Sequence, residues 1–264
     1  GGTSIMAIID DPSAYFQTKT YTGNGSARAI TFDGNSDLQP DWVWIKKRSG
    51  GSATSHVVTD VVRGLNKQLF TNEAEAEESY TSVLTAFGSN GFSLSTAGLV
   101  NTDTNTYVAW NWKAGTSFTN DASATGIGTI DSTGSVNTTS GFSIVTYTGN
   151  ATAGETVAHG LGSVPKIMII KRVTGGATQW VVYHVGTGNT KACYLNTTTA
   201  PVTVTGFFNN TTPTSSVFTV GTDTACNGDG NGMIAYCFAD TSMSKMGSYT
   251  GNGNANGTFV YTGF

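Results

Sequence analysis

The sequence predicts an all-β protein built of two tandem β-sandwich, jelly-roll-like modules that arose by internal duplication. Short runs of β-branched and aromatic residues, separated by Gly, Asn, Asp and Ser clusters, fill almost the whole chain. This pattern is typical of the strands and turns of sandwich proteins. The string Tyr-Thr-Gly-Asn-Gly at residues 21–25 returns as Tyr-Thr-Gly-Asn-Ala at 147–151. Self-similarity at such a period indicates a repeated structural unit.

The repeat extends well beyond this pentapeptide and divides the chain. Three further stretches of the first half align with the second: 40–46 with 165–171, 67–72 with 191–196, and 107–112 with 233–238. Each repeat is about a hundred residues long, an ordinary domain size. We therefore expect an N-terminal segment at 1–16 (with 1–5 a remnant of expression), module 1 at 17–114, a Gly/Ser/Thr-rich linker with a hairpin at 115–141, and module 2 at 142–240.

Residues 241–264 begin the same pattern a third time, with Tyr-Thr-Gly-Asn-Gly at 249–253. They are interpreted either as a strand that closes module 2 or as the start of a third repeat, and the second interpretation, with a natural chain that continues, is favoured.

Each module is expected to contain seven strands, because alternation and β-branched content mark seven runs in each. Alternation is clearest at 107–112, where successive side chains point to opposite faces of a sheet. Residues 72–87 could hold a helical turn or two, and the four glutamates within 73–78 are expected to form a solvated face. The expected strands are 19–22, 27–32, 42–46, 55–61, 67–71, 92–95 and 107–112, followed by 143–148, 155–159, 167–172, 180–184, 192–196, 217–220 and 233–238.

Composition narrows the classes of function. Charged residues make up 11% of the chain and the net charge is −4, so the surface is polar but nearly neutral, as suits a protein outside a cell or on a particle. The 13 Lys and Arg residues are scattered, which argues against nucleic-acid binding. No apolar run is long enough for a membrane helix. The three cysteines, Cys193, Cys226 and Cys237, all lie in module 2, so a disulfide framework is not expected.

One stretch carries a partial calcium-loop pattern. Asn227, Asp229 and Asn231 place oxygen-bearing side chains at alternate positions between glycines, an arrangement that can wrap a hard cation. Phe238 stands where such a loop needs its bidentate glutamate, and hairpin turns use the same residue types. A turn is therefore the favoured interpretation, and we expect no metal and no cofactor.

No catalytic constellation stands out. The chain lacks the Gly-x-Ser-x-Gly nucleophile elbow, and its three histidines have no metal-ligand spacing. Glycoside hydrolysis needs two carboxylates across a cleft, whereas the acidic residues lie mostly in turns or in the glutamate cluster. The sequence therefore predicts that the protein is not an enzyme.

Aromatic pairs favour packing over ligand binding. In module 1, Trp42 and Trp44 alternate along one expected strand, and Trp110 and Trp112 along another. At the aligned positions module 2 keeps apolar residues of other shapes, which favours core packing over sugar stacking. The remaining candidates for ligand stacking are Trp180, Tyr183 and Tyr80.

The motif string as a whole resembles the repeated module of tail-fibre-like and other virion structural proteins of marine bacteriophages. The resemblance covers 17–264 and rests on the pentapeptide, Pro-Asp-Trp-Val-Trp-Ile-Lys at 40–46, Tyr-Val-Ala-Trp-Asn-Trp-Lys at 107–113 and Gly-Phe-Ser-Ile-Val-Thr-Tyr at 141–147. It implies a β-rich component of the virion, extracellular when mature, that forms a homo-oligomer, with a trimer favoured, and contacts other virion proteins. It transfers no catalytic residue. The alternative expectation is a carbohydrate-binding module that recognises a cell-surface glycan.

Overall fold

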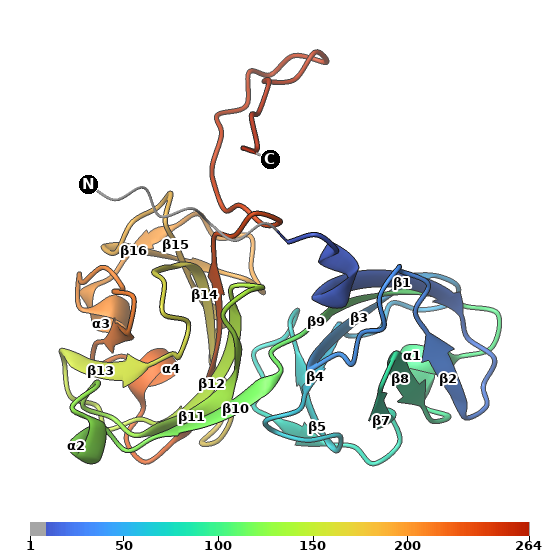
Figure 1. Cartoon of the computed structure of the whole chain (residues 1–264), viewed down its shortest axis with the longest axis horizontal. Coiled ribbons are helices and arrows are strands. Elements are labelled where there is room, and N and C mark those ends of the chain that lie inside the picture. Colours follow the sequence, from blue (N-terminus) through green and yellow to red (C-terminus); the bar gives the residue numbers. More distant parts are fainter. Residues whose placement is uncertain (1–8, 264) are drawn as a thin grey trace.

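The computed structural model describes residues 9–263, and its β-sandwich modules lie side by side (Figure 1). Strands hold 38% of the residues and helices 7%, in several antiparallel sheets, which confirms the all-β sandwich class. All helices are single turns, so the sheets alone determine the shape of the molecule.

In module 1 a six-stranded antiparallel sheet faces a three-stranded sheet. The 3-10 turn η1 (Pro12–Ala14) precedes the first strand, and α1 (Gly98–Asn101) precedes the last. The larger sheet has the order β1 (Phe16–Thr22), β9 (Thr106–Trp112), β3 (Trp42–Ser49), β4 (Val57–Asp60), β5 (Lys67–Phe70), β6 (Glu78–Ser79), and the smaller sheet the order β2 (Arg28–Thr31), β8 (Gly91–Leu94), β7 (Leu84–Gly88).

In module 2 an eight-stranded sheet faces a two-stranded sheet. The single-turn helices are α2 (Ala122–Thr125), α3 (Thr205–Phe208) and α4 (Thr224–Asn227). The larger sheet has the order β10 (Thr116–Asn120), β11 (Ser132–Asn137), β12 (Phe142–Thr148), β19 (Gly232–Ala239), β14 (Pro165–Arg172), β15 (Val181–His184), β16 (Lys191–Tyr194), β17 (Val202–Thr203), and the smaller sheet pairs β13 (Glu155–Ala158) with β18 (Val217–Val220).

Each module has its own core between its two sheets. In β9 the burial alternates with every residue, as the sequence predicts. Tyr107 and Ala109 point into the module 1 core, which also contains Phe92 from the facing sheet. In module 2, Val145 of β12 and Phe218 of β18 belong to the corresponding core. The period of two therefore places one face of each large sheet inside its own module.

The opposite faces of the two large sheets pack on each other and form a third apolar core. Trp42 lies at its centre, 2% exposed, and its ring stacks on Tyr236 of module 2 at 4.8 Å between centroids. Phe142 lies 5.5 Å from the same indole. We call this cluster the intermodule core, and its buried members are Trp42, Val58, Leu69, Ala114, Phe142, Ile144, Ile169, Trp180, Ile234, Tyr236 and Phe238. The modules therefore touch through well-packed apolar surface instead of swinging on a linker.

The two modules share one hydrogen-bond pattern around their Tyr-Thr-Gly-Asn motifs, at 21–24 and 147–150. The Tyr21 hydroxyl donates to Val100 O at 2.8 Å, and the Tyr147 hydroxyl donates to Cys226 O at 2.6 Å. Both bonds join residues 79 positions apart. The two modules therefore share a buried polar contact at the same place as well as the sequence motif.

Two local expectations were wrong, and so was the less favoured of the two alternatives for residues 241–264. Residues 72–87 contain β6 and part of β7 but no helix. A hairpin exists in the expected linker, but it pairs β10 with β11 and joins the large sheet of module 2 as its edge. The described residues beyond 240 form no strand, so they do not close module 2.

Candidate binding surfaces

Two of the three residues expected to stack on a ligand are buried. Trp180 is fully buried in the intermodule core, where its Nε1 donates to Phe70 O at 2.9 Å. Tyr183 is 2% exposed and packs edge-on against Phe208 inside module 2. The stacking expectation was therefore wrong for both. Tyr80 is 37% exposed and lies edge-on against Phe70 at the border of the sheet.

The partial calcium pattern is a structural turn around a buried asparagine. Asn227 is 0% exposed; its Oδ1 accepts the Asn150 amide at 2.8 Å, and its Nδ2 donates to Gly221 O at 2.7 Å. Asp229 is exposed, and its carbonyl oxygen accepts from Asn231 Nδ2 at 2.9 Å. Asn101 makes the matching bonds in module 1. Within residues 9–263 no three His, Cys, Asp or Glu side chains gather as a metal site would require.

A buried ionic cluster joins the two modules. Arg63 donates through Nε to Asp60 Oδ2 at 2.7 Å and through Nη1 to Glu77 Oε2 at 3.3 Å. The Tyr236 hydroxyl of module 2 donates to the same Asp60 oxygen at 2.8 Å. Burial opposes the charge of Arg63, but Asp60, Tyr236 and Glu77 together raise its pKa above the ordinary value. Glu77 is therefore a packed ion-pair partner, which corrects the expectation that the glutamate cluster is wholly solvated.

Lys171 is a second polar link between the modules. Its side chain is fully buried, and its Nζ donates to Ala74 O of module 1 at 2.6 Å and to Thr178 O at 2.5 Å. Burial lowers the pKa of Lys171 to about 8. All its close partners are backbone carbonyls or the ring of Trp180, so a positioning role at the interface accounts for it without catalysis.

The histidine and cysteine side chains do not gather into a site. His159 is buried, and its Nδ1 accepts the Leu161 amide at 3.2 Å while its Nε2 lies 3.1 Å from Thr214 O. Burial lowers the pKa of His159 to about 4, so the ring is neutral at pH 7. The three cysteines are free thiols, and burial raises the pKa of Cys237 to about 12. A thiol so protonated is a poor nucleophile.

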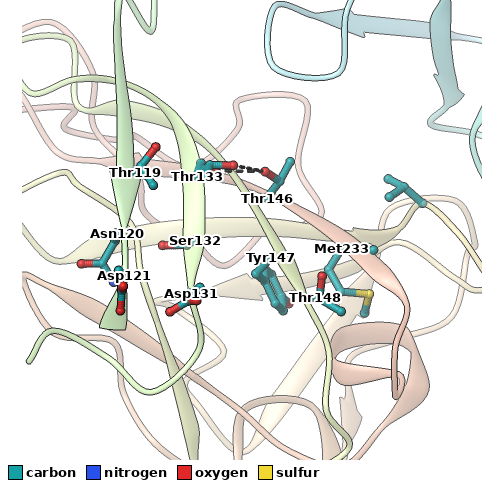
Figure 2. A pocket seen from close by; sticks show the side chains of 12 residues that line it. Thr119, Asn120, Asp121, Asp131, Ser132, Thr133, Thr146, Tyr147, Thr148 and Met233 are labelled. Atoms are coloured by element: carbon teal, nitrogen blue, oxygen red, sulfur yellow. Dashed lines mark hydrogen bonds between the residues drawn. The ribbon is translucent and has the colours of Figure 1, made fainter. Parts of the chain in front are cut away.

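An open, hydroxyl-rich groove of about 440 Å³ lies on module 2 (Figure 2). Thr119, Thr133 and Thr146 stand opposite one another on β10, β11 and β12. The hydroxyls of Thr133 and Thr146 lie 2.9 Å apart. We call this hollow the threonine groove, and it is lined by Thr119, Asn120, Asp121, Asp131, Ser132, Thr133, Thr146, Tyr147, Thr148, Val173, Gly232 and Met233.

Two exposed carboxylates stand at one end of the threonine groove (Figure 2). Asp131 Oδ1 accepts the Ala122 amide at 2.9 Å, and Asp121 Oδ1 accepts the Ser123 hydroxyl at 2.7 Å. The bonds from Ser123 and the Ala124 amide lower the pKa of Asp121. Both carboxylates cap the first turn of α2, and each has a second oxygen that could accept from a ligand. The sequence did not single out this groove, because its serines and threonines look like ordinary turn and edge residues.

Among residues 9–263, the most exposed aromatic side chains lie in the segment beyond module 2. Residues 249–263, which we call the C-terminal arm, extend away from the body (Figure 1). Tyr249, Phe259 and Tyr261 are 69%, 88% and 81% exposed. Hydrogen bonds within the arm include one from Thr258 Oγ1 to Thr250 O at 2.8 Å. No helix in the described part of the chain is long and apolar enough to cross a membrane.

Comparison with known proteins gives a family but no activity. No curated protein and no solved structure matches the chain. One family, described as a domain of unknown function, DUF7483, matches residues 11–264. The match spans both modules and the arm together, in agreement with the intermodule core that joins them. The chain belongs to the DUF7483 family.

Proposed function

We propose that the chain is a non-enzymatic structural protein of a phage particle, part of a tail fibre or similar appendage with an adhesive or assembly role. The proposal starts from the motif string that resembles virion modules. It is supported by the intermodule core, which makes one stiff body of two sandwiches. Four buried ionisable side chains also serve packing: Arg63 pairs with both Asp60 and Glu77, and Lys171 donates to backbone carbonyls.

The intermodule core is the observation on which this proposal depends most. A fibre or appendage must transmit force between its subunits without bending at each junction. Two sandwiches that share an apolar core cannot hinge without exposing Trp42 and its neighbours to water, which costs free energy in proportion to the apolar area exposed. A nearly uncharged polar surface also suits a component outside the cell, where repeated weak contacts supply avidity.

The experiment is to locate the protein on phage particles. An antibody raised against the chain should label a tail or surface appendage of the phage that encodes it, seen by electron microscopy. Purified chain incubated with host polysaccharide should release no reducing ends. Absence of label from intact particles, or release of sugar, would overturn the proposal.

The threonine groove supports a second candidate function, recognition of a cell-surface glycan. Hydroxyls in a row, an amide and two carboxylates with free oxygens offer the donors and acceptors that bind sugar hydroxyls. Its volume of about 440 Å³ lies within the usual range of small-molecule sites. The one aromatic residue that lines the groove, Tyr147, is only 5% exposed and belongs to the module 2 core, so its ring offers little surface for stacking.

Calorimetric titration with host envelope polysaccharide tests this candidate. The double variant Thr133→Val and Thr146→Val removes two hydroxyls from the floor of the groove, and binding should weaken at least tenfold. Thr203→Val, an exposed β17 position outside the groove, is the matched control. Equal binding by all three proteins would place any sugar site elsewhere.

A further inference from the structure

We propose that the C-terminal arm adds as a β-strand to the outer edge of β1 in a second copy of the chain. This inference rests on the proposed assembly role and names the contact that would serve it. Its starting point is an internal comparison between the modules. Strands β1 and β12 hold equivalent places, since both end in the Tyr-Thr head and both pair with the last strand of their module.

The outer edge is covered in module 2 and open in module 1. In module 2, β11 pairs antiparallel along β12 from Ser132↔Tyr147 to Asn137↔Phe142. In module 1, β1 is the edge strand of its sheet, and no described strand pairs with its outer side. Thr18 and Thr20 are exposed along this edge. Unpaired backbone groups on an edge strand form a template for another strand. In module 2 the equivalent edge, that of β12, is covered by the antiparallel strand β11.

The arm has the composition of a strand that lacks a partner. Residues 258–262 read Thr-Phe-Val-Tyr-Thr, a run of β-branched and aromatic residues without charge or proline. Phe259 and Tyr261 would lie on one face of such a strand, and both are more than 80% exposed in the isolated chain. An uncharged arm meets no repulsion at β1, where Lys19 is already paired with Asp33 at 3.0 Å.

The surface beside β1 offers a place for an aromatic ring. Phe16 lies on the same face of β1 as Thr18 and Thr20, and its ring packs on Trp112 at 4.6 Å. Next to this pair is a hollow of about 180 Å³, lined by Phe16, Trp112, Ser140, Gly141, Phe238, Met243, Ser244 and Met246. A strand added to β1 with Phe259 or Tyr261 on this face would lay a ring over the hollow and bury apolar surface on both copies.

The geometry favours a second copy over the arm's own body. Met246 lines the hollow beside the first residue of β1, so the arm leaves the body at this point and extends away from it (Figure 1). Extended, the chain from Met246 to Gly263 reaches about 55 Å, more than twice the length of a seven-residue strand. This length spans to a neighbouring copy and also allows return to the arm's own β1, so a cross-link between copies is needed to separate the two. Exchange in one direction, from copy to copy, generates a closed ring or a filament, and a trimer is the closed state that the resemblance to virion modules implies.

Light scattering on the full chain tests the proposal. The unmodified protein should form an oligomer whose mass depends on concentration. The double variant Phe259→Asp and Tyr261→Asp should weaken self-association at least tenfold without loss of fold, because both side chains are exposed. Ile127→Asp is the matched control, since Ile127 is an exposed apolar residue on the body at 44%. A monomer at every concentration, or an oligomer unaffected by the arm variant, would refute the proposal.

A disulfide cross-link then identifies the partner strand. In a Cys193→Ser background, Thr20→Cys and Tyr261→Cys, which would lie on the same face of the extended sheet, should form a covalent bond between copies on oxidation, visible as a doubled or larger mass on a non-reducing gel. A bond formed only within single chains would overturn the proposal. If virions are labelled but the arm variants assemble normally, this inference fails while the proposed function stands. If the arm joins copies but virions are unlabelled, the reverse holds.

Discussion

Trp42 is the residue on which the union of the modules most depends. Its indole touches Trp44 and Trp112 of its own sheet and Phe142, Tyr236 and Phe238 of the other module. The sequence predicted correctly that Trp42 packs in a core, because module 2 keeps an apolar residue at the aligned position. It did not indicate that this packing lies between the modules, since apolar substitution looks the same in either core.

Trp42→Ala should therefore destabilise the whole chain. Removing a fully buried tryptophan typically costs about 3–5 kcal/mol, and here the cavity would open at the intermodule core. Chemical denaturation followed by far-UV circular dichroism measures the loss. The control is Ile127→Ala at an exposed position, which should change the free energy of unfolding by less than about 0.5 kcal/mol. Equal stability of the Trp42 variant and the control would contradict the packing described.

His159 should make stability depend on acidity. Its pKa is about 4 in the folded protein, below the ordinary value of 6.5, so the unfolded chain binds more protons between these pH values. Its contribution is fully present above pH 6.5 and is lost as the pH falls towards 4, with a total of about 3 kcal/mol. Unfolding midpoints at pH 7.5 and pH 5 measure this loss, and it should shrink in His159→Gln. A slope unchanged by the substitution would rule out His159 as its source.

Trp180 and Tyr183 illustrate why exposure was hard to predict at the scale of single residues. Trp180 directly precedes β15 and Tyr183 lies within it. Both faces of their sheet are covered, one by the module 2 core and the other by the intermodule core. Alternation tells which residues share a face, but not whether that face meets water. Their burial could be predicted only with the packing of the second sheet in view.

At the scale of elements, the strands that follow the β-sandwich pattern were predictable and the hydroxyl-rich ones were not. β9, β14 and β19 carry alternating or continuous apolar runs, which mark them in the sequence. β10 and β11 consist mostly of Thr, Ser, Asn and Gly, so they look like a linker. They form strands because β12 supplies a ready edge. Tertiary pairing therefore overrides weak local propensity here.

Gly134 should be essential to the pairing of β11 with β12. A Cβ at this position would lie 2.0 Å from Ile144 O and 2.9 Å from a ring atom of Phe118. Gly134→Ala should destabilise the protein by about 1–3 kcal/mol, as overpacking does. Gly251→Ala in the C-terminal arm, where a Cβ meets nothing within 4 Å, is the control. Thermal unfolding compares the two, and an unaffected Gly134 variant would show that β11 can separate from β12 at no cost.

The stability of the two modules should fall by similar amounts when the buried asparagines Asn101 and Asn227 are removed. Asn101→Ala and Asn227→Ala each leave buried backbone partners unsatisfied and should each cost about 3 kcal/mol. Because the Asn227 side chain is already bonded within the protein, added calcium should leave the melting temperature of the unmodified chain unchanged. A rise in melting temperature with calcium that Asn227→Ala abolishes would restore the metal interpretation.

At the scale of the whole molecule, the two modules should unfold as one unit. The intermodule core, the Asp60–Arg63–Tyr236 cluster and Lys171 all cross the boundary between them. Tryptophan fluorescence, which reports mainly on the intermodule core, and far-UV circular dichroism, which reports on all strands, should give coincident transitions in denaturant. Two separated transitions would mean that the modules are independent domains in contact.

The intermodule core also limits which rearrangements a gene that encodes these two modules can tolerate. A recombination event that deleted or reordered one module would leave the other with a large exposed apolar surface, prone to aggregation. Shuffling of single halves between relatives is therefore costly, and the pair is expected to be inherited as an indivisible block.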